Sequence, residues 1–182
     1  VTVRGPMMQA LMVETMLLLN INHQSLIATK ANRIVRAAAG RPVMEFGARR
    51  AQGADGAYYG ARAAIIGGCM GTSDVKTAKD FDVKATGTMA HSWVQMFDDE
   101  YLAFKTYAEK YPDSCMLLVD TYNVLKSGIP NAIKVFDEVL APLGKRPLGI
   151  RIDSGDITYI TKKARAMLDE AGYSDCKICV SN

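Results

Sequence analysis

The sequence predicts an α/β fold in which parallel strands alternate with helices. From residue 43 onward, short apolar runs recur along the chain, and longer helical stretches separate them. The runs are apolar throughout and do not alternate with polar residues, which is typical of strands buried on both faces. We therefore expect a parallel sheet covered by helices, either doubly wound or closed as a barrel.

The composition is that of a globular protein. The 182 residues are 49% hydrophobic and 23% charged, which suffices for a buried core. The net charge of +3 is small and the basic residues are scattered, so we expect small anionic ligands and no nucleic-acid partner. The most apolar stretch, Met7–Leu19, contains Glu14 and is too short for a membrane span. We expect the four cysteines to be reduced core residues of a cytoplasmic protein.

Residues 1–40 form a predicted helical segment. Pro6 suits the first turn of a helix, and Gly40 suits its end. His23 and its neighbouring asparagines interrupt the apolar pattern, so both two helices and one kinked helix agree with the sequence. Residues 41–182 are the alternating part, and the junction between the two parts is the one domain boundary that we predict.

Six apolar runs are the predicted strands, and five longer stretches are the predicted helices. The strands are Val43–Phe46, Ile65–Cys69, Val83–Ala85, Cys115–Val119, Leu148–Ile152 and Lys177–Val180. The helices are Asp55–Ala64, Ser73–Phe81, Ser92–Tyr111, Asn131–Leu140 and Asp156–Glu170.

Polar and charged side chains lie at or after five successive predicted strand ends. Because the carboxyl ends of parallel strands meet at one edge of a sheet, we expect these side chains to face one rim. They include Arg49, Ser73, Thr88, His91, Asp120, Arg151, Asp153 and Ser154, and Gly155 lies in the last of these loops.

Each of these loops alone has a structural explanation. Glycine, serine and aspartate after a strand suit a turn into a capped helix, as at Ser73 and Asp156. A single histidine such as His91 is more often structural than catalytic. What favours a site is the combination of fixed cations, carboxylates, hydroxyls and a histidine at one rim.

This combination suits a phosphorylated substrate. Arginines and backbone amides would spread the phosphate charge, and carboxylates would hold Mg²⁺ or ribose hydroxyls. A phosphoribosyl transfer fits, because its transition state separates an oxocarbenium-like sugar from pyrophosphate. Neither a Gly-x-x-x-x-Gly-Lys-Ser/Thr loop nor a Gly-x-Gly-x-x-Gly turn is present in the sequence, which disfavours a P-loop ATPase or a classical dinucleotide fold.

Five ordered segments resemble those of nicotinate phosphoribosyltransferases, and the likeness extends from about Val3 to Asn182. Together the five are specific, although no single one is. They are Glu45 to Gly53, Gly71 to Val75, Gly87 to Ser92, Leu118 to Tyr122 and Gly149 to Asp156.

The resemblance implies a fold and a reaction. The fold is an irregular type II phosphoribosyltransferase α/β barrel, here partial, preceded by a helical segment and accompanied by a second domain. The reaction joins nicotinate to phosphoribosyl pyrophosphate, giving nicotinate mononucleotide and pyrophosphate for NAD salvage. It is coupled to ATP hydrolysis, needs Mg²⁺, and proceeds in a homodimer. The histidine that matches His91 is transiently phosphorylated, which adds negative charge beside the substrate.

The resemblance also implies residue roles. Phe46 would stack on the pyridine ring. Arg49, Thr88 and Arg151 would lie near the carboxylate and phosphate groups, with Ser154 and Gly155 also in the substrate site. Asp120 and Asp153 would be acids near the ribose and metal.

The substrate prediction depends on Ser73. The related nicotinamide enzymes place an aspartate at the position aligned with it, where a negative charge would repel a carboxylate. The neighbouring Asp74 makes this inference sensitive to the register of the alignment. We therefore predict nicotinate, with nicotinamide as one alternative and quinolinate, which needs no ATP, as another.

The ends of the sequence also carry an expectation. The chain opens without methionine and closes just after a predicted strand, so we expect the central part of a longer protein. The family's amino-terminal lid and glycine-rich phosphate loop would lie outside it. We expect these residues alone to show little or no turnover, and an inactive ligand-binding fragment of the same fold is a further alternative.

Overall fold

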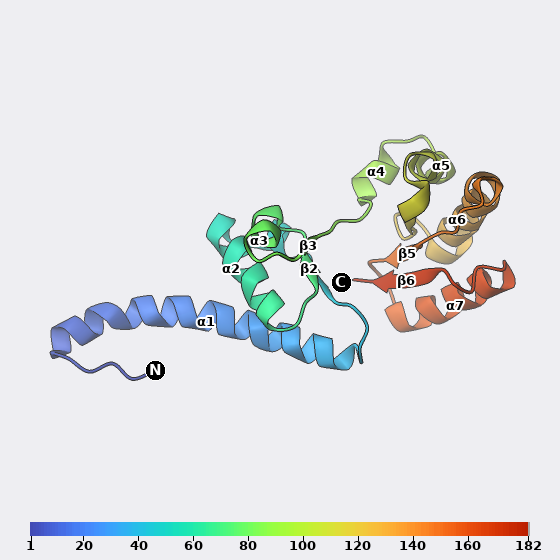
Figure 1. Cartoon of the computed structure of the whole chain (residues 1–182). Helices are drawn as coiled ribbons and strands as arrows, with labels where there is room; N and C mark the ends of the chain where they lie inside the picture. The colour runs from blue at the N-terminus through green and yellow to red at the C-terminus, as the bar shows by residue number, and fades with distance from the viewer. Residues whose placement is uncertain (182) are drawn as a thin grey trace. The chain divides into compact units, whose positions relative to one another are not determined.

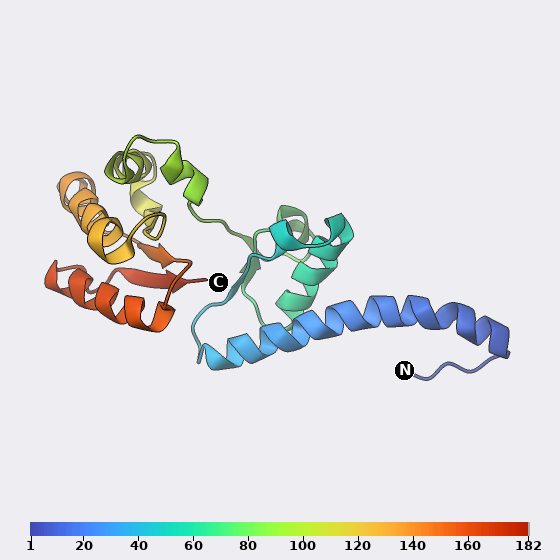
Figure 2. The ribbon, with the colours of Figure 1, turned by 180° about the vertical axis from the view of Figure 1, so that it is seen from behind.

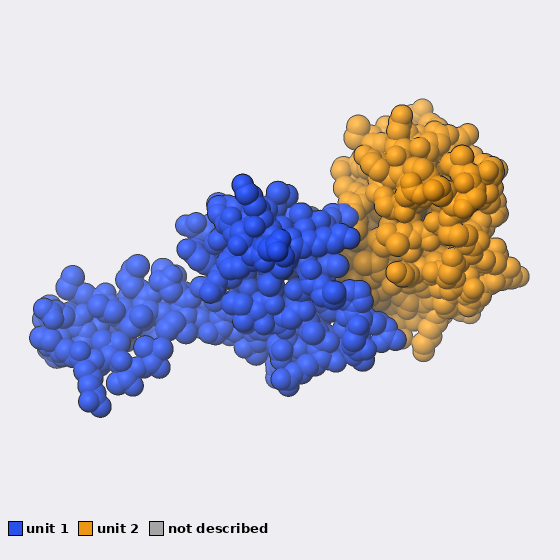
Figure 3. All heavy atoms as spheres, in the orientation of Figure 1, with its two compact units in different colours: residues 1–87 blue, residues 88–182 orange. Residues whose placement is uncertain are grey.

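The computed structural model describes residues 1–181, and the chain divides into two compact units, residues 1–87 and 88–182 (Figure 3). Each unit contains short strands and several helices (Figure 1). The predicted α/β class is therefore confirmed. The predicted boundary at residue 40 lies within the first unit. That it separates two domains in the complete protein stays a prediction.

Unit 1 contains four helical elements and three short strands. In chain order they are α1 (Met7–Ala37), β1 (Met44–Glu45), the 3₁₀ turn η1 (Ala48–Arg50), α2 (Gly53–Ile66), β2 (Gly71–Thr72), α3 (Val75–Asp80) and β3 (Lys84–Ala85). The strands are all parallel, in the order β1-β2-β3.

Helix α1 is one continuous helix of 31 residues (Figure 1; Figure 2). Its second half packs on α2, where a Cβ atom at Gly67 would lie only 2.7 Å from the Ala28 carbonyl oxygen. In the described chain, its first half carries exposed large apolar side chains, at Met7, Met8, Leu11, Met12, Val13, Met16, Leu18 and Leu19. The attachment of α1 to unit 1 therefore rests on its second half.

Unit 2 contains the longer strands. Its elements are α4 (His91–Gln95), α5 (Glu100–Lys110), η2 (Pro112–Ser114), β4 (Met116–Leu118), the π-helical turn η3 (Val124–Gly128), α6 (Ile129–Val135), the π-helical turn η4 (Phe136–Leu140), η5 (Ala141–Leu143), β5 (Gly149–Ile152), α7 (Ile157–Glu170) and β6 (Lys177–Val180). The strands are again parallel, in the order β4-β5-β6.

The main hydrophobic core lies in unit 2. Strands β4 and β5 bury Leu117, Leu118, Ile150 and Ile152 completely, and the helices of the unit pack against them. Side-chain caps fix where two of these helices begin, because Asp99 accepts from the Leu102 N–H and Asp156 from the Tyr159 N–H. The core and the caps together hold the carboxyl ends of the strands in place.

Three predicted elements differ from the structure. The strand predicted at Ile65–Cys69 is wrong, because α2 continues through Ile66 and the strand lies later, at Gly71–Thr72. The helix predicted at Ser92–Tyr111 is two helices, since the Asp99 cap starts α5 afresh. The helix predicted at Asn131–Leu140 begins earlier and has π-helical turns at both ends.

The barrel prediction is met only in part. The residues described form two separate three-stranded parallel sheets, and no closed barrel is present among them. None of the helices in residues 1–181 has the length and apolar character needed to cross a membrane.

The cysteines form no disulfide, as predicted. Three are buried and Cys179 is half-buried. Burial raises the pKa of the Cys115 thiol to about 12 and that of Cys176 to about 11, which keeps both as unreactive thiols.

Candidate active site

The three strands of unit 2 carry polar side chains at one edge of their sheet. β4 leads into Asp120, β5 contains Arg151 and leads into Asp153, and β6 leads into Ser181. Arg151 is paired in register with the neighbouring strand on each side. The carboxyl ends of the three strands therefore lie side by side.

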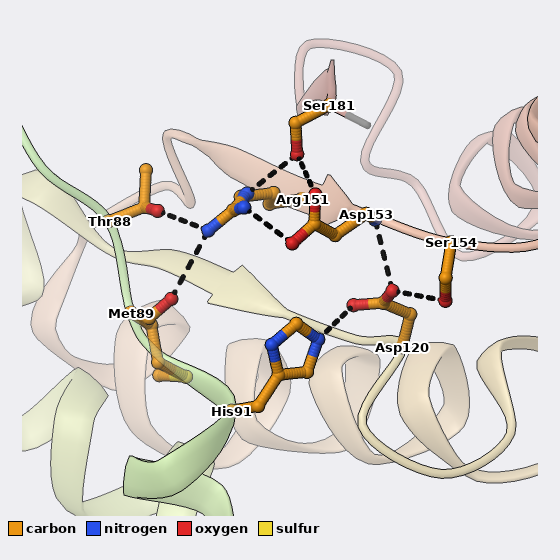
Figure 4. Close-up of polar contacts among 8 residues, drawn as sticks. All are labelled: Thr88, Met89, His91, Asp120, Arg151, Asp153, Ser154 and Ser181. Atoms are coloured by element: carbon orange, nitrogen blue, oxygen red, sulfur yellow. Dashed lines mark hydrogen bonds and ion pairs between the residues drawn. The ribbon is translucent and has the colours of Figure 1, made fainter. Parts of the chain in front are cut away.

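Asp120 is the buried centre of this cluster (Figure 4). Its side chain is 1% exposed. Oδ1 lies 3.2 Å from His91 Nε2, while Oδ2 accepts hydrogen bonds from the Asp153 backbone N–H at 3.0 Å and the Ser154 hydroxyl at 2.6 Å. A buried carboxylate needs such partners on both oxygens, and here they join the ends of β4 and β5 to α4.

His91 is oriented by this carboxylate. It is the first residue of α4, and its side chain is 41% exposed. Because an ionised carboxylate only accepts hydrogen bonds, Nε2–H donates to Asp120 and Nδ1 keeps its lone pair. Figure 4 shows this second ring nitrogen on the side of the imidazole away from Asp120. An imidazole held in this way is suited to act as a nucleophile or as a proton acceptor.

The guanidinium of Arg151 forms hydrogen bonds in two directions (Figure 4). Nη2 lies 2.7 Å from Asp153 Oδ2, and Nε lies 3.0 Å from Ser181 Oγ. On the other side, Nη1 donates to the Thr88 hydroxyl at 2.6 Å and reaches the Met89 carbonyl oxygen at 3.5 Å. Arg151 therefore joins the sheet to the segment that leads into α4.

Asp153 is the charged partner of this arginine. The Arg151 and Asp153 side chains are only 12% and 15% exposed. Burial opposes the ionisation of Asp153, but the Ser181 hydroxyl and the Arg151 guanidinium outweigh it, and the net result is a lowered pKa of the carboxyl. The pair is therefore an ion pair at neutral pH.

Ser154 and Gly155 line a cavity of about 290 Å³ with Asp120 and the loop that follows β4. Gly155 has φ +83°, and a Cβ atom there would lie 2.8 Å from Ile160 Cδ1. The positive φ favours glycine here, whereas the space is limited only by the flexible end of the Ile160 side chain. The Tyr122 side chain adds a further polar group to the wall, so the cavity suits a small polar ligand.

The other three predicted site residues belong to unit 1. Phe46 and Ser73 directly follow β1 and β2, whose pairing puts both at one edge of that sheet. Arg49 lies in η1 and is exposed. Ser73 is not the cap of α3, because Asp74 accepts the capping hydrogen bond from the Thr77 N–H at 3.1 Å. That Arg49 shares one cavity with the residues of unit 2 stays a prediction.

Sequence reasoning missed two residues of these clusters. Ser181 follows the sixth predicted strand, so the strand-end rule applied to the other five strands would have found it. Glu45 links the loops after β1 and β2, because it accepts hydrogen bonds from the Thr72 hydroxyl at 2.5 Å and from the Gly47 N–H. It lies inside a predicted strand, where no sequence signal marks it.

The residues present do not form a metal site of their own. Among residues 1–181, no group of three or more His, Cys, Asp or Glu side chains is arranged to hold a metal ion. Asp120 and Asp153 accept hydrogen bonds from protein donors on both oxygens. That these two acids lie near the ribose and a metal ion in the complete protein stays a prediction.

The fold and the cluster define an α/β protein with polar side chains gathered at the carboxyl ends of parallel strands, the place where such folds bind small ligands. The nicotinate phosphoribosyltransferase family model matches residues 42–180. A nicotinate phosphoribosyltransferase of Bacillus subtilis is 50% identical over 99% of this chain and 36% of its own length. One from Mycobacterium tuberculosis is 44% identical over 98% of this chain and 38% of its own length.

Solved structures agree with these relatives. Human nicotinic acid phosphoribosyltransferase has a TM-score of 0.78 at 30% identity, over 98% of this chain and 46% of that one. A nicotinate-nucleotide pyrophosphorylase from Pyrococcus furiosus has a TM-score of 0.73 at 33% identity, over 87% of this chain and 40% of that one. The chain therefore belongs to the nicotinate phosphoribosyltransferase family. It spans 36% to 38% of the length of the two bacterial relatives.

Proposed function

We propose that this chain carries part of the active site of an ATP-coupled nicotinate phosphoribosyltransferase of NAD salvage. The observation that carries the proposal is the pairing of His91 with the buried Asp120 at the strand ends, within a chain 50% identical to a nicotinate phosphoribosyltransferase. The type II barrel, the homodimer and the cytoplasmic location belong to the same proposal for the complete protein.

The proposed reaction has a defined balance of bonds. The pyridine nitrogen of nicotinate attacks the anomeric carbon of phosphoribosyl pyrophosphate, a C–N bond forms, and the C–O bond to pyrophosphate breaks. Positive charge develops on the sugar and negative charge on the leaving group, so the protein must stabilise both. Mg²⁺ would arrive with the phosphates of the substrates, in keeping with the lack of a protein cage among the described residues.

His91 would take the phosphoryl group of ATP. In the tautomer inferred from the contact with Asp120, Nδ1 attacks the γ-phosphorus, an N–P bond forms, and the P–O bond to ADP breaks. Asp120 would stabilise the positive charge that the imidazole gains, because its Oδ1 already lies 3.2 Å from Nε2. The phosphorylated His91 would change the charge beside the donor site and so couple ATP hydrolysis to transfer.

The other predicted residues would bind the substrates. Phe46 would stack on the pyridine ring, and Arg49 and Arg151 would pair with carboxylate or phosphate oxygens. Asp153 would act near the ribose. The neutral groups of the proposed substrate site are Ser73, Thr88, Ser154 and Gly155.

The geometry around Ser73 supports nicotinate over nicotinamide. The Asp74 carboxylate is engaged in capping α3, through the hydrogen bond from Thr77 N–H at 3.1 Å. It therefore serves the helix, and Ser73 is the residue at the strand end. A neutral side chain there does not repel the carboxylate of nicotinate.

The proposal is tested by incubating the complete protein with phosphoribosyl pyrophosphate, Mg²⁺, ATP and, in separate reactions, nicotinate, nicotinamide or quinolinate. We expect nicotinate mononucleotide from nicotinate, and faster formation with ATP than without it. Product from nicotinamide or quinolinate in preference to nicotinate would contradict the substrate assignment. We expect residues 1–182 alone to show little or no turnover.

The role of His91 is tested by phosphoenzyme labelling. The chain contains two histidines, so His23→Ala is a matched control for His91→Ala. With γ-labelled ATP we expect an acid-labile, base-stable label on the parent and on His23→Ala, and none on His91→Ala. His23 is exposed and makes only a 3.4 Å contact with the Gly56 carbonyl oxygen, so its loss should be mild. Label that persists in His91→Ala would exclude the proposed acceptor.

A further inference from the structure

The Arg151–Asp153 pair is not a simple two-point ion pair. Arg151 Nη2 donates to Asp153 Oδ2 directly, but Nε does not reach the other carboxylate oxygen. The hydroxyl of Ser181 lies between them, accepting from Nε at 3.0 Å and donating to Oδ1 at 2.6 Å. The three side chains therefore form a closed ring of hydrogen bonds (Figure 4).

The ring orients the guanidinium. A serine hydroxyl has one proton, and here that proton points to Asp153, so a lone pair of Ser181 Oγ faces Arg151 Nε. Two of the three guanidinium nitrogens are thereby engaged within the ring. The third, Nη1, is turned toward Thr88 and the Met89 carbonyl oxygen, in the segment that leads into α4.

The position of Ser181 is itself fixed. Its backbone N–H donates to the Ile152 carbonyl oxygen at 3.0 Å, which continues the pairing of β6 with β5 by one residue. The sheet thus fixes the backbone of Ser181, and the short side chain places the hydroxyl close to that backbone. It lies 30 residues from Arg151 in sequence, on a different strand.

We propose that Ser181 is a positioning residue, whose hydroxyl sets the orientation of Arg151 and Asp153 and, through Arg151, of the segment before His91. This inference rests on the proposed function, in which Arg151 binds a substrate anion and Asp153 acts near the ribose. Ser181 would not touch the substrates. Its loss would leave a buried Nε and Oδ1 without their partner, and the arginine would turn away from its binding orientation.

The decisive comparison is between Ser181→Thr and Ser181→Val in the complete protein. Both variants add the same methyl group and suit a strand end, but only threonine keeps the hydroxyl. We expect Ser181→Thr to have KM values near those of the parent. We expect Ser181→Val to raise the KM for nicotinate roughly 10- to 100-fold, the usual cost of removing a group that orients a binding residue, with a smaller change in kcat.

A merely structural role would give a different result. Partial misfolding lowers the amount of active enzyme, and therefore kcat, but leaves KM unchanged. KM values of Ser181→Thr and Ser181→Val that agree within about twofold would overturn the inference. Ser174→Ala is the control, since Ser174 is exposed in the turn before β6 and should keep parent kinetics. If the parent itself makes no nicotinate mononucleotide, the proposed function fails instead.

Hydrogen exchange gives a second measurement that does not need activity. In Ser181→Ala we expect faster exchange of the Trp93 and Met96 amides, which hydrogen-bond within α4, because Arg151 no longer holds the segment before this helix in one orientation. Exchange in the middle of α7 should not change. Unaltered protection of the Trp93 and Met96 amides would show that Ser181 does not act through Arg151, even where a variant is too unstable for kinetics.

Discussion

Glu100 is an acid that the fold buries without fully pairing it. The residue is 5% exposed, Oε2 accepts from Asn131 Nδ2 at 3.1 Å, and Oε1 has no hydrogen-bond partner. Burial raises the pKa of the Glu100 carboxyl, although Asn131 and Ser127 act against this. The folded state therefore favours the protonated form more strongly than the unfolded chain does.

The raised pKa of Glu100 makes the protein less stable as the pH rises. A carboxyl whose folded pKa is raised contributes stability at pH below its unfolded value, and this contribution is lost as pH rises through the folded pKa. We expect Glu100→Gln to stabilise the protein by about 1 kcal/mol at pH 7, because it removes a buried, unpaired charged oxygen. The gain should shrink toward pH 4. Denaturant unfolding at both pH values checks this.

Glu109→Gln is the matched control on the same helix. Glu109 is exposed, so its substitution should change the unfolding free energy by less than about 0.5 kcal/mol at either pH. Equal effects of the two substitutions at pH 7, or a gain for Glu100→Gln that does not change with pH, would contradict the expected role of burial.

At the scale of elements, the loop after β4 is held by an unusually close approach. A Cβ atom at Gly128 would lie 1.9 Å from the Val119 carbonyl oxygen. Gly128 has φ −56° and ψ −56°, which any residue adopts, so space alone demands glycine here. This contact presses the π-helical turn η3 against the end of β4, directly beside Asp120.

We therefore expect Gly128→Ala to cost about 3 kcal/mol of unfolding free energy, because the added methyl group meets backbone that cannot move freely. Gly56→Ala is the opposite case. Gly56 lies in α2, and its added Cβ would meet only Ala51 Cβ at 3.9 Å. Alanine should stabilise that helix by roughly 0.5 to 1 kcal/mol. Thermal unfolding should show a lower Tm for Gly128→Ala and a higher Tm for Gly56→Ala than for the parent. An unchanged Tm for Gly128→Ala would refute the steric argument.

The elements that the sequence predicted best are those with a local cause. Lys177–Val180 is a strand with its predicted bounds, and α7 begins directly after Asp156, whose capping is a local preference. The elements predicted worst depend on tertiary contacts. The π-helical turn η3 before α6 contains the tightly packed Gly128, and hydrophobic periodicity does not predict such a turn. The apolar run at Ile65 belongs to the end of helix α2, and a short apolar run alone does not distinguish a helix from a strand.

At the scale of the whole molecule, the core is unevenly divided. The largest fully buried side chains among residues 1–181 all lie in unit 2, Phe104 and Phe136 among them. The core cluster of unit 1 consists of the small residues Ala31, Ala64 and Cys69, with Ile27 and Val43 packed against it. The hydrophobic contribution to stability is therefore concentrated in residues 88–181.

We expect residues 88–182 expressed alone to fold cooperatively, with an unfolding free energy of about 5 kcal/mol, which is typical of a small domain. Residues 1–87 alone should show helical circular dichroism but no cooperative transition. Urea titrations of both pieces, followed by circular dichroism, make the comparison. A sharp transition in residues 1–87, or none in residues 88–182, would reverse this assignment.

The sequence predicts which residues of the site lie together better than it predicts which side chains pair. The strand-end rule predicts residues of five loops, Arg49 and Ser73 included, at one rim. In unit 2, His91, Asp120, Arg151 and Asp153 lie together. A common rim with Arg49 and Ser73 stays a prediction, as do the catalytic roles. The pairing of each acid with its partner could not be predicted, because it depends on side-chain directions that only the packed sheet sets. Ser181 is the clearest example, since its hydroxyl matters only once β6 lies beside β5.

The ring around Arg151 also implies an order of events during synthesis. Arg151 leaves the ribosome before Ser181, which follows 30 residues later, so a nascent chain carries the guanidinium before it carries the hydroxyl that orients it. Strand β6 must then join β5 before the ring can close. This edge of the sheet is thus among the last parts of unit 2 to form, and a chain released before residue 181 would keep most of its core while lacking the hydroxyl that orients Arg151.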